Sequence, residues 1–268
     1  MPPMQRMMQR LQQDRAAGRG SLMPFLTAGS PSIEATVATI LTLDGLGVAA
    51  IEIGFPFSDP IADGPVIAAS MDRALRAGTT VAAIVDAIRD VRPRVGCGLI
   101  AMVSMSIVHR HGGAEFVAAL HDAGFDALIV PDMDVDDADL ITQAVEQRGM
   151  GLALLVAPTS SPERIRAITR RCRGFVYALA RAGLTGASDA PPDVEGTVSA
   201  IRAETELPIA VGFGISTPAH VRMVIQHADA AIVGSALVRA MDGEPDSAHE
   251  RAQAFIGPML EACRVTAR

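Results

Sequence analysis

The 268-residue chain contains no lysine and no tryptophan, only one tyrosine, and three cysteines. A Schiff base with a carbonyl substrate requires an amine side chain, so the missing lysine excludes imine chemistry of the class I aldolase type. The cysteines, Cys97, Cys172 and Cys263, have neither metal-binding spacing nor the pattern of a disulfide framework. Unpaired cysteines of this kind are typical of a reducing compartment, and we expect a cytoplasmic protein.

Long apolar runs and a basic surface are missing as well. No hydrophobic stretch approaches the length that crosses a bilayer, so no membrane partner is expected. The formal net charge of −7 argues against a nucleic-acid partner. An anionic small molecule must then be bound by local donors. Because 49% of the residues are hydrophobic and only 3% are aromatic, the core is expected to be aliphatic.

Short apolar segments alternate with helical patterns along the chain, and we interpret residues 1–268 as one domain. Eight segments are apolar on both faces, as parallel strands covered by helices should be. They are Leu22–Leu26, Ala49–Ile53, Gly98–Met102, Ala127–Val130, Leu152–Val156, Phe175–Leu179, Ile209–Val211 and Ala230–Val233. Eight strand–helix units in a chain of this length predict an α/β fold, a closed (β/α)8 TIM barrel. A doubly wound open sheet is the alternative, although no dinucleotide fingerprint accompanies it.

Helix starts are marked by hydroxyl residues followed by proline, a pairing that caps and pre-sets the first turn. The three pairs are Ser30-Pro31, Ser161-Pro162 and Thr217-Pro218. Before the first strand, Met4, Met8 and Leu11 share one helical face. We expect an extra N-terminal helix that plugs the bottom of the barrel, rather than a targeting peptide.

Three carboxylates gather around the second predicted strand. Glu52 interrupts the apolar strand itself, and Asp59 and Asp63 follow in a proline-rich loop. A carboxylate in a buried strand is costly unless it is paired or used in chemistry. A single such glutamate could be structural, satisfied by backbone N–H groups. Three carboxylates together, at a strand end where barrel enzymes keep their chemistry, favour a functional site.

Two glycine-containing loops follow the last two predicted strands. One carries Gly214, and the other carries Gly234 and Ser235, which we expect to open a short extra helix. Glycine lets the backbone approach a ligand closely, and the N–H groups at a helix start attract anions. Barrel enzymes bind phosphate at these loops, so we predict a phosphate site here, with simple tight turns as the alternative.

Other segments give weaker signals. The small and proline-rich residues 187–193, which follow the sixth predicted strand, indicate a mobile lid. His109 and His111 have no third ligand at metal-binding spacing, so no metal site is predicted. Met102 and Met105 are interpreted as filling side chains of the core or surface.

The segment Glu52-Ile53-Gly54-Phe55-Pro56-Phe57-Ser58-Asp59-Pro60-Ile61-Ala62-Asp63-Gly64-Pro65 resembles the signature of the tryptophan synthase α subunit. The resemblance covers the whole chain. It implies a lyase that cleaves indole-3-glycerol phosphate to indole and glyceraldehyde 3-phosphate without a metal or organic cofactor. Glu52, with its pKa raised by burial, is the expected general acid–base group, and Asp63 would accept the indole N–H. The expected substrate-binding residues are Phe25, Tyr177, Thr185, Gly186, Gly214, Gly234 and Ser235.

The resemblance also implies a partner, a β subunit bound in a complex of two α and two β subunits. Pro56, Asp59 and Ser106 are the expected contacts. The third-strand motif of the family, Met-x-Tyr-x-Asn, departs here, because Ser104 and Ser106 stand at the Tyr and Asn positions. Further departures are Ala68 for a glutamine and Ala180 for a serine. We expect the changes at 104 and 106 to weaken the complex.

Sequence leaves other functions open. A barrel lyase or isomerase could act on a different aryl or sugar phosphate. A stand-alone lyase could supply indole to specialised metabolism. A catalytically weak subunit could bind a phosphate ligand and activate a partner.

Overall fold

A computed structural model describes residues 3–60, 63–135, 138–180, 194–212 and 214–264. Its nine parallel strands form one nearly closed barrel in the order β5-β4-β3-β2-β1-β9-β8-β7-β6. The strands are β1 (Ser21–Thr27), β2 (Ala50–Gly54), β3 (Gly98–Met102), β4 (Ala127–Ile129), β5 (Gly151–Ala153), β6 (Leu155–Val156), β7 (Val176–Leu179), β8 (Ile209–Gly212) and β9 (Ala230–Val233). The predicted TIM-barrel fold is confirmed.

The fifth predicted strand is not continuous, and this is why nine strands are found instead of eight. Leu154 separates β5, which pairs with β4, from β6, which pairs with β7. Leu152 pairs with Leu128 of β4 and also forms an antiparallel bridge with Arg173, in the segment that precedes β7. The backbone therefore changes neighbours at Leu154, and the two ends of the sheet meet within this one segment.

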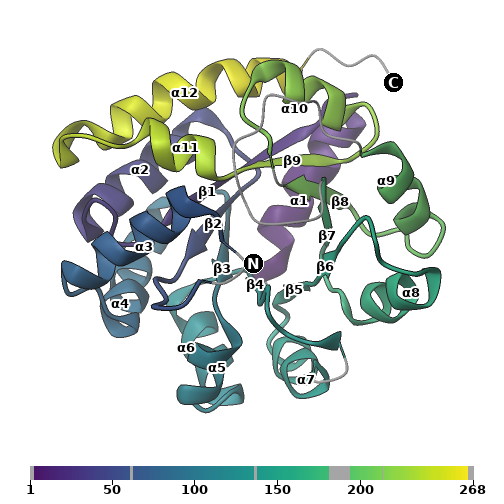
Figure 1. The fold of residues 1–268 in the computed structure, drawn as a ribbon, viewed down its shortest axis with the longest axis horizontal. Coiled ribbons are helices and arrows are strands. Elements are labelled where there is room, and N and C mark those ends of the chain that lie inside the picture. Colours follow the sequence, from purple (N-terminus) through teal and green to yellow (C-terminus); the bar gives the residue numbers. More distant parts are fainter. Residues whose placement is uncertain (1–2, 61–62, 136–137, 181–193, 213, 265–268) are drawn as a thin grey trace.

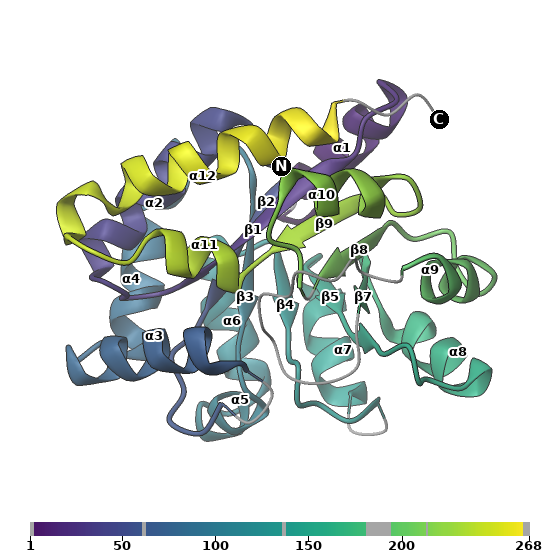
Figure 2. The same ribbon diagram turned by 45° about the horizontal axis from the view of Figure 1, so that its top comes forward.

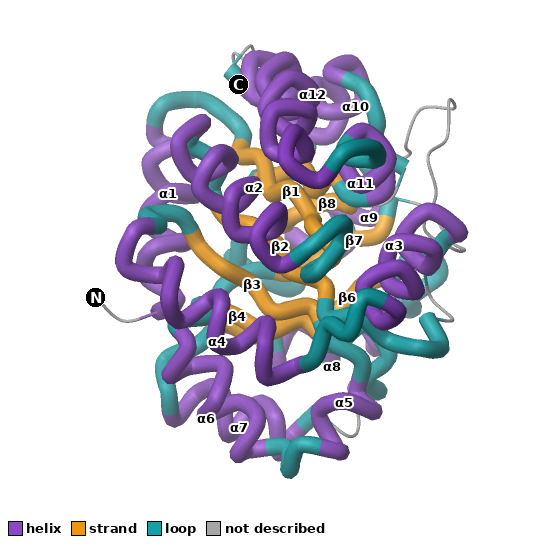
Figure 3. The backbone as a smooth tube through the Cα atoms, turned by 90° about the vertical axis from the view of Figure 1, so that its left-hand side faces the viewer, coloured by secondary structure: helices purple, strands orange, loops and turns teal. Residues whose placement is uncertain are grey.

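Helices surround the strands on the outside of the barrel (Figures 1 and 3). They are α2 (Ile33–Leu46), α3 (Pro65–Arg76), α4 (Val81–Val91), α5 (Met105–Arg110), α6 (Ala114–Ala123), α7 (Asp139–Gln147), α8 (Pro162–Arg171), α9 (Glu195–Arg202), α10 (Pro218–Ile225), α11 (Ser235–Ala240) and α12 (Ala248–Cys263). The last helix, α12, packs against α2 and α10, as Figure 2 shows. It therefore connects the helix that follows the first strand with the helix that precedes the last strand. Within the described residues, no helix is long and apolar enough to span a bilayer.

The N-terminal helix α1 (Pro3–Ala16) plugs the amino-terminal end of the barrel, as predicted. Met7 and Leu11 are buried in the same cluster as Met23, Ile100 and other inward-facing strand residues. A second and larger aliphatic cluster lies between the strands and the outer helices. Since the bottom is closed by α1, the open space inside the barrel lies at the carboxyl ends of the strands.

Two of the three predicted helix starts are confirmed. Ser161 caps α8 and Thr217 caps α10, each by accepting a hydrogen bond from the backbone N–H three residues later. The prediction at Ser30 is wrong, because α2 begins at Ile33 and its cap is Ser32, which accepts from the Ala35 N–H. The short helix α11 begins at Ser235, directly after Gly234, as expected.

Candidate active site

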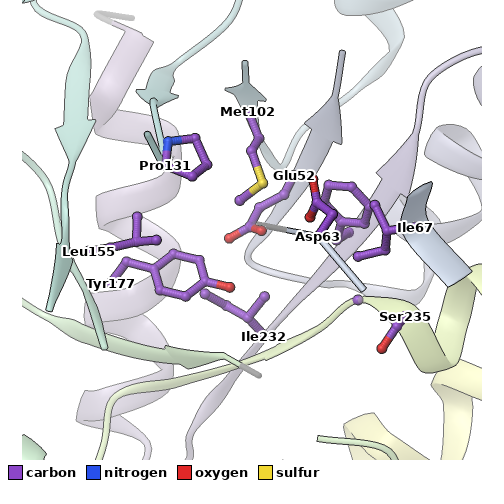
Figure 4. A pocket seen from close by; sticks show the side chains of 11 residues that line it. Glu52, Asp63, Ile67, Met102, Pro131, Leu155, Tyr177, Ile232 and Ser235 are labelled. Carbon is purple, nitrogen blue, oxygen red and sulfur yellow. The ribbon is translucent and has the colours of Figure 1, made fainter. Parts of the chain in front are cut away.

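A pocket opens at the carboxyl ends of the strands, and Figure 4 shows the side chains that line it. Its walls come from six strands, from the loops that follow β2, β4 and β9, and from the starts of α3 and α11. The lining residues are Phe25, Glu52, Asp63, Ile67, Met102, Pro131, Leu155, Tyr177, Ile232, Gly234 and Ser235. Six predicted site residues therefore meet in one place, although they are scattered over most of the chain.

Glu52 occupies the centre of β2, where its backbone pairs with Phe25 of β1 and Ile100 of β3. The side chain is fully buried and points into the pocket (Figure 4). Neither carboxyl oxygen has a hydrogen-bond partner among the described residues. Burial raises the pKa of Glu52 well above its usual range, because the charged form loses its hydration. Burial therefore favours the protonated form of this group, which can donate its proton.

Asp63 enters the pocket from the loop between β2 and α3. Its N–H donates to the Pro60 carbonyl, and α3 begins two residues later at Pro65. Partial burial, with a smaller contribution from the negative charge of Asp132, raises the pKa of Asp63 to about 6. Near neutral pH this side chain is mainly ionised, whereas burial favours the protonated form of Glu52 in the same pocket.

Tyr177 extends from β7 with its hydroxyl directed toward Glu52 (Figure 4). The ring is buried, and its pKa is raised by burial and by the negative charges of Glu52 and Asp63. Gly212 of β8 makes room for it, since a Cβ on Gly212 would come within 2.2 Å of the Tyr177 hydroxyl oxygen. Gly54 does the same for Phe25, whose ring lies 2.5 Å from the position of such a Cβ.

The remaining walls of the pocket are apolar, which suits a flat aromatic ring. Sequence reasoning missed Ile67, Pro131, Leu155 and Ile232, and it interpreted Met102 only as filler. Only their positions near strand ends could have indicated these residues. Met102 ends β3, Pro131 follows β4 and Leu155 begins β6. Apolar residues at strand ends cannot be told from core residues by sequence alone.

At the other end of the pocket lie Gly234 and Ser235, at the start of α11. Gly214 is buried in the β8–α10 loop with φ of 77°, a conformation that favours glycine, but it does not line this pocket. Thr185, Gly186 and the predicted lid at 187–193 lie outside the described residues.

The predicted partner contacts occupy a second hollow beside the pocket. Asp59 and Ser106 are exposed and line this hollow together with Asp63, whereas Pro56 is buried and does not line it. For His109 and His111, no group of potential metal ligands is found within the described part of the chain.

Comparison with known proteins decides the family. The sequence model described as tryptophan synthase alpha chain matches residues 11–263. The chain belongs to this family. The alpha chain of Thermosynechococcus vestitus is 41% identical over 240 residues, which cover 89% of this chain and 90% of that one. The alpha chain of Gloeobacter violaceus is 39% identical and covers 91% of this chain, with 87% of its own length matched.

Solved structures agree with this assignment to the alpha chain family. A structure of tryptophan synthase from Mycobacterium tuberculosis superposes with a TM-score of 0.88 at 34% identity, covering 96% of this chain and 98% of that chain. The alpha subunit from Legionella pneumophila gives a TM-score of 0.85 at 28% identity, with 98% of both chains covered. Tryptophan synthase alpha chains are carbon–carbon lyases of tryptophan biosynthesis that form a complex with a β subunit, and this chain is a lyase of that family.

Proposed function

We propose that the pocket around Glu52 cleaves indole-3-glycerol phosphate to indole and glyceraldehyde 3-phosphate by a retro-aldol reaction. The observation that carries this proposal is the fully buried Glu52 carboxyl, which faces an apolar pocket that also contains the mainly ionised Asp63. Three free and buried cysteines support a cytoplasmic location for the reaction.

The protonation states fit the proton movements of this reaction. Neutral Glu52 donates a proton to C3 of the indole ring, which leaves positive charge on the ring nitrogen. Asp63 accepts the indole N–H hydrogen bond and stabilises this charge. The Glu52 carboxylate then removes the proton of the glycerol hydroxyl next to the ring. The C–C bond breaks, its electron pair restores the aromatic indole, and the hydroxyl carbon becomes the aldehyde of glyceraldehyde 3-phosphate.

The phosphate is proposed to bind at the far end of the pocket, near Gly214, Gly234 and Ser235. The backbone N–H groups at the start of α11 and the Ser235 hydroxyl are suitable donors. No basic side chain lines the pocket within the described residues, so these donors would have to hold the dianion. Thr185 and Gly186 are proposed to complete the site from the loop after β7.

The replacement Glu52→Gln tests the acid–base role. Glutamine preserves the shape of the side chain but cannot transfer the proton, so indole release should fall by at least about 10²-fold. Binding of glycerol 3-phosphate, measured by calorimetry, should be retained because the phosphate end of the pocket is unchanged. The control is Glu115→Gln on the exposed face of α6, which should leave turnover unchanged. Near-normal indole release by Glu52→Gln would rule out the assignment.

The partner is proposed to be a tryptophan synthase β subunit that binds more weakly than is usual for the family. Ser106 is exposed at the start of α5, and a serine offers less hydrogen-bonding capacity there than the asparagine it replaces. Losing such a contact costs about 1–3 kcal/mol, which corresponds to roughly a ten- to hundredfold loss of affinity.

The replacement Ser106→Asn measures this effect. Affinity for an added β subunit, followed by titration, should rise in the variant, and activation of indole release should rise with it. Strong activation of the unmodified protein, with no gain in Ser106→Asn, would show that this position does not limit the complex.

A further inference from the structure

Asp132 lies on the loop between β4 and α7 and was not indicated by any sequence motif. Its exposed side chain lines the hollow beside the catalytic pocket, together with Asp63, Ser104 and Ser106. The preceding residue, Pro131, lines both the hollow and the catalytic pocket. Asp132 therefore stands between the expected partner surface and the reacting groups.

Two donors from the third-strand loop fix the Asp132 carboxylate. The Ser104 hydroxyl donates to Oδ2 at 2.8 Å, and the Met105 N–H donates to Oδ1 at 2.8 Å. The Ser104 oxygen also accepts a hydrogen bond from the Ser106 N–H at 3.2 Å, which caps α5. Because both carboxylate oxygens are engaged, the negative charge is held in one place although the side chain is exposed.

The charged and titratable groups around Asp63 come from four elements. Glu52 of β2 and Tyr177 of β7 share the catalytic pocket with it, while Asp59 and Asp132 share the neighbouring hollow. Within the described residues, no basic side chain lines either cavity. Burial raises the pKa of Glu52 and of Tyr177 and so favours the neutral form of each. Of the two exposed aspartates, Asp132 is the one whose charge contributes to raising the pKa of Asp63.

We propose that Asp132 is a positioning residue for the lyase reaction, held by Ser104 and the Met105 N–H so that its negative charge acts on the Asp63 carboxyl. This charge makes Asp63 a stronger acceptor for the indole N–H. The hydrogen bonds from Ser104 and from the Met105 N–H also connect Asp132 to α5, the helix that carries Ser106. A tyrosine at position 104, as in the family motif, has its hydroxyl too far from its own backbone to cap α5 and bind Asp132 in this way. The contact with Asp132 therefore depends on the serine at position 104.

The replacement Asp132→Asn tests the electrostatic effect directly. Asparagine keeps a carbonyl oxygen for one donor but removes the charge. In 13C NMR titrations of side-chain carboxyls, with Asp63→Asn used to assign the signal, the midpoint of Asp63 should fall by about half a pH unit. The matched control is Asp134→Asn, which removes an equal charge from the same loop, where Arg164 lies 3.9 Å away. An unchanged Asp63 midpoint in Asp132→Asn would overturn the proposal.

The replacement Ser104→Ala tests how the charge is held. The Asp63 midpoint should move in the same direction by a smaller amount, and Ser104→Thr should restore it because threonine keeps the hydroxyl. No shift in Ser104→Ala would remove Ser104 from the proposal.

The kinetic consequence rests on the proposed lyase function. The acid limb of kcat for indole release should move to lower pH in Asp132→Asn, because Asp63 then stays ionised to lower pH. The NMR titration does not depend on activity. A failed cleavage assay with a shifted midpoint would count against the lyase function, and an unshifted midpoint would count against the role of Asp132.

Discussion

The replacement Glu52→Met should stabilise the protein while abolishing its reaction. Glu52 is fully buried and lacks a hydrogen-bond partner among the described residues. Methionine has a similar volume and a flexible side chain, so it can fill the same space in this largely apolar pocket without a polar atom to satisfy. Under the proposed mechanism, this costly group is retained because the reaction needs it.

The expected magnitude follows from two contributions. An unsatisfied buried polar group costs about 1–3 kcal/mol. A gain of about 2 kcal/mol would raise Tm by roughly 4–8 °C in a protein of this size. The second contribution depends on pH. The pKa of Glu52 is raised in the folded protein above its ordinary value of 4.5, so the unfolded chain loses its proton first as pH rises.

The wild-type protein therefore loses stability as pH rises from about 4.5 toward the raised pKa, by up to about 1.4 kcal/mol for each pH unit. Glu52→Met has no such group, so its advantage over wild type should be smallest at pH 4.5, where only the unsatisfied polar atoms contribute, and should grow at pH 6 and pH 8. Glu52→Gln, which stays neutral, should lose the pH dependence but keep the unsatisfied polar atoms.

Thermal unfolding at these three pH values, followed by calorimetry, measures both effects. Indole release by Glu52→Met serves as the functional readout and should be undetectable. If Glu52→Met were no more stable than wild type at pH 8, the raised pKa and the unsatisfied carboxyl would both be refuted as descriptions of this site.

Two further predictions concern the opposite ends of the barrel. Ser235→Asp places a negative charge at the start of α11, so it should weaken glycerol 3-phosphate binding by about tenfold or more. Calorimetry measures this affinity, and Ser199→Asp, at an exposed position, is the control. Equal affinities of the two variants would mean that the phosphate binds elsewhere. Asp126→Ala removes the buried carboxylate that accepts from Arg6 and Arg92 at 3.1 Å each, and from the Leu99 N–H at 2.8 Å. The uncompensated charge of Arg92 should lower the free energy of unfolding by about 3–5 kcal/mol, and a loss below 1 kcal/mol in urea titrations would contradict this account.

Much of the barrel could be predicted from local sequence, because parallel strands covered on both faces are short and apolar whatever their neighbours are. The third and last strands have the predicted bounds, Gly98–Met102 and Ala230–Val233. The sequence also indicated Glu52, as a carboxylate within an apolar strand, and Asp63, in the loop that follows, and both line the pocket. The N-terminal plug was visible too, because Met4, Met8 and Leu11 share a face.

Other features depend on pairing and packing, which local sequence does not record. The split of the fifth strand at Leu154 is caused by the change from β4 to β7 as neighbours at barrel closure. Ser32 rather than Ser30 caps α2, because α2 begins at Ile33 and the capping residue directly precedes the first turn.

The site itself shows the same division. The identity of its carboxyl groups could be determined from the sequence, but their protonation could not, because a pKa depends on burial and on charges from distant segments. Asp132 is far from Asp63 in the chain and approaches it only because β2 and β4 end on the same side of the barrel. Met102, Pro131 and Leu155 become pocket walls for the same reason, since only barrel closure turns the ends of separate strands toward one cavity.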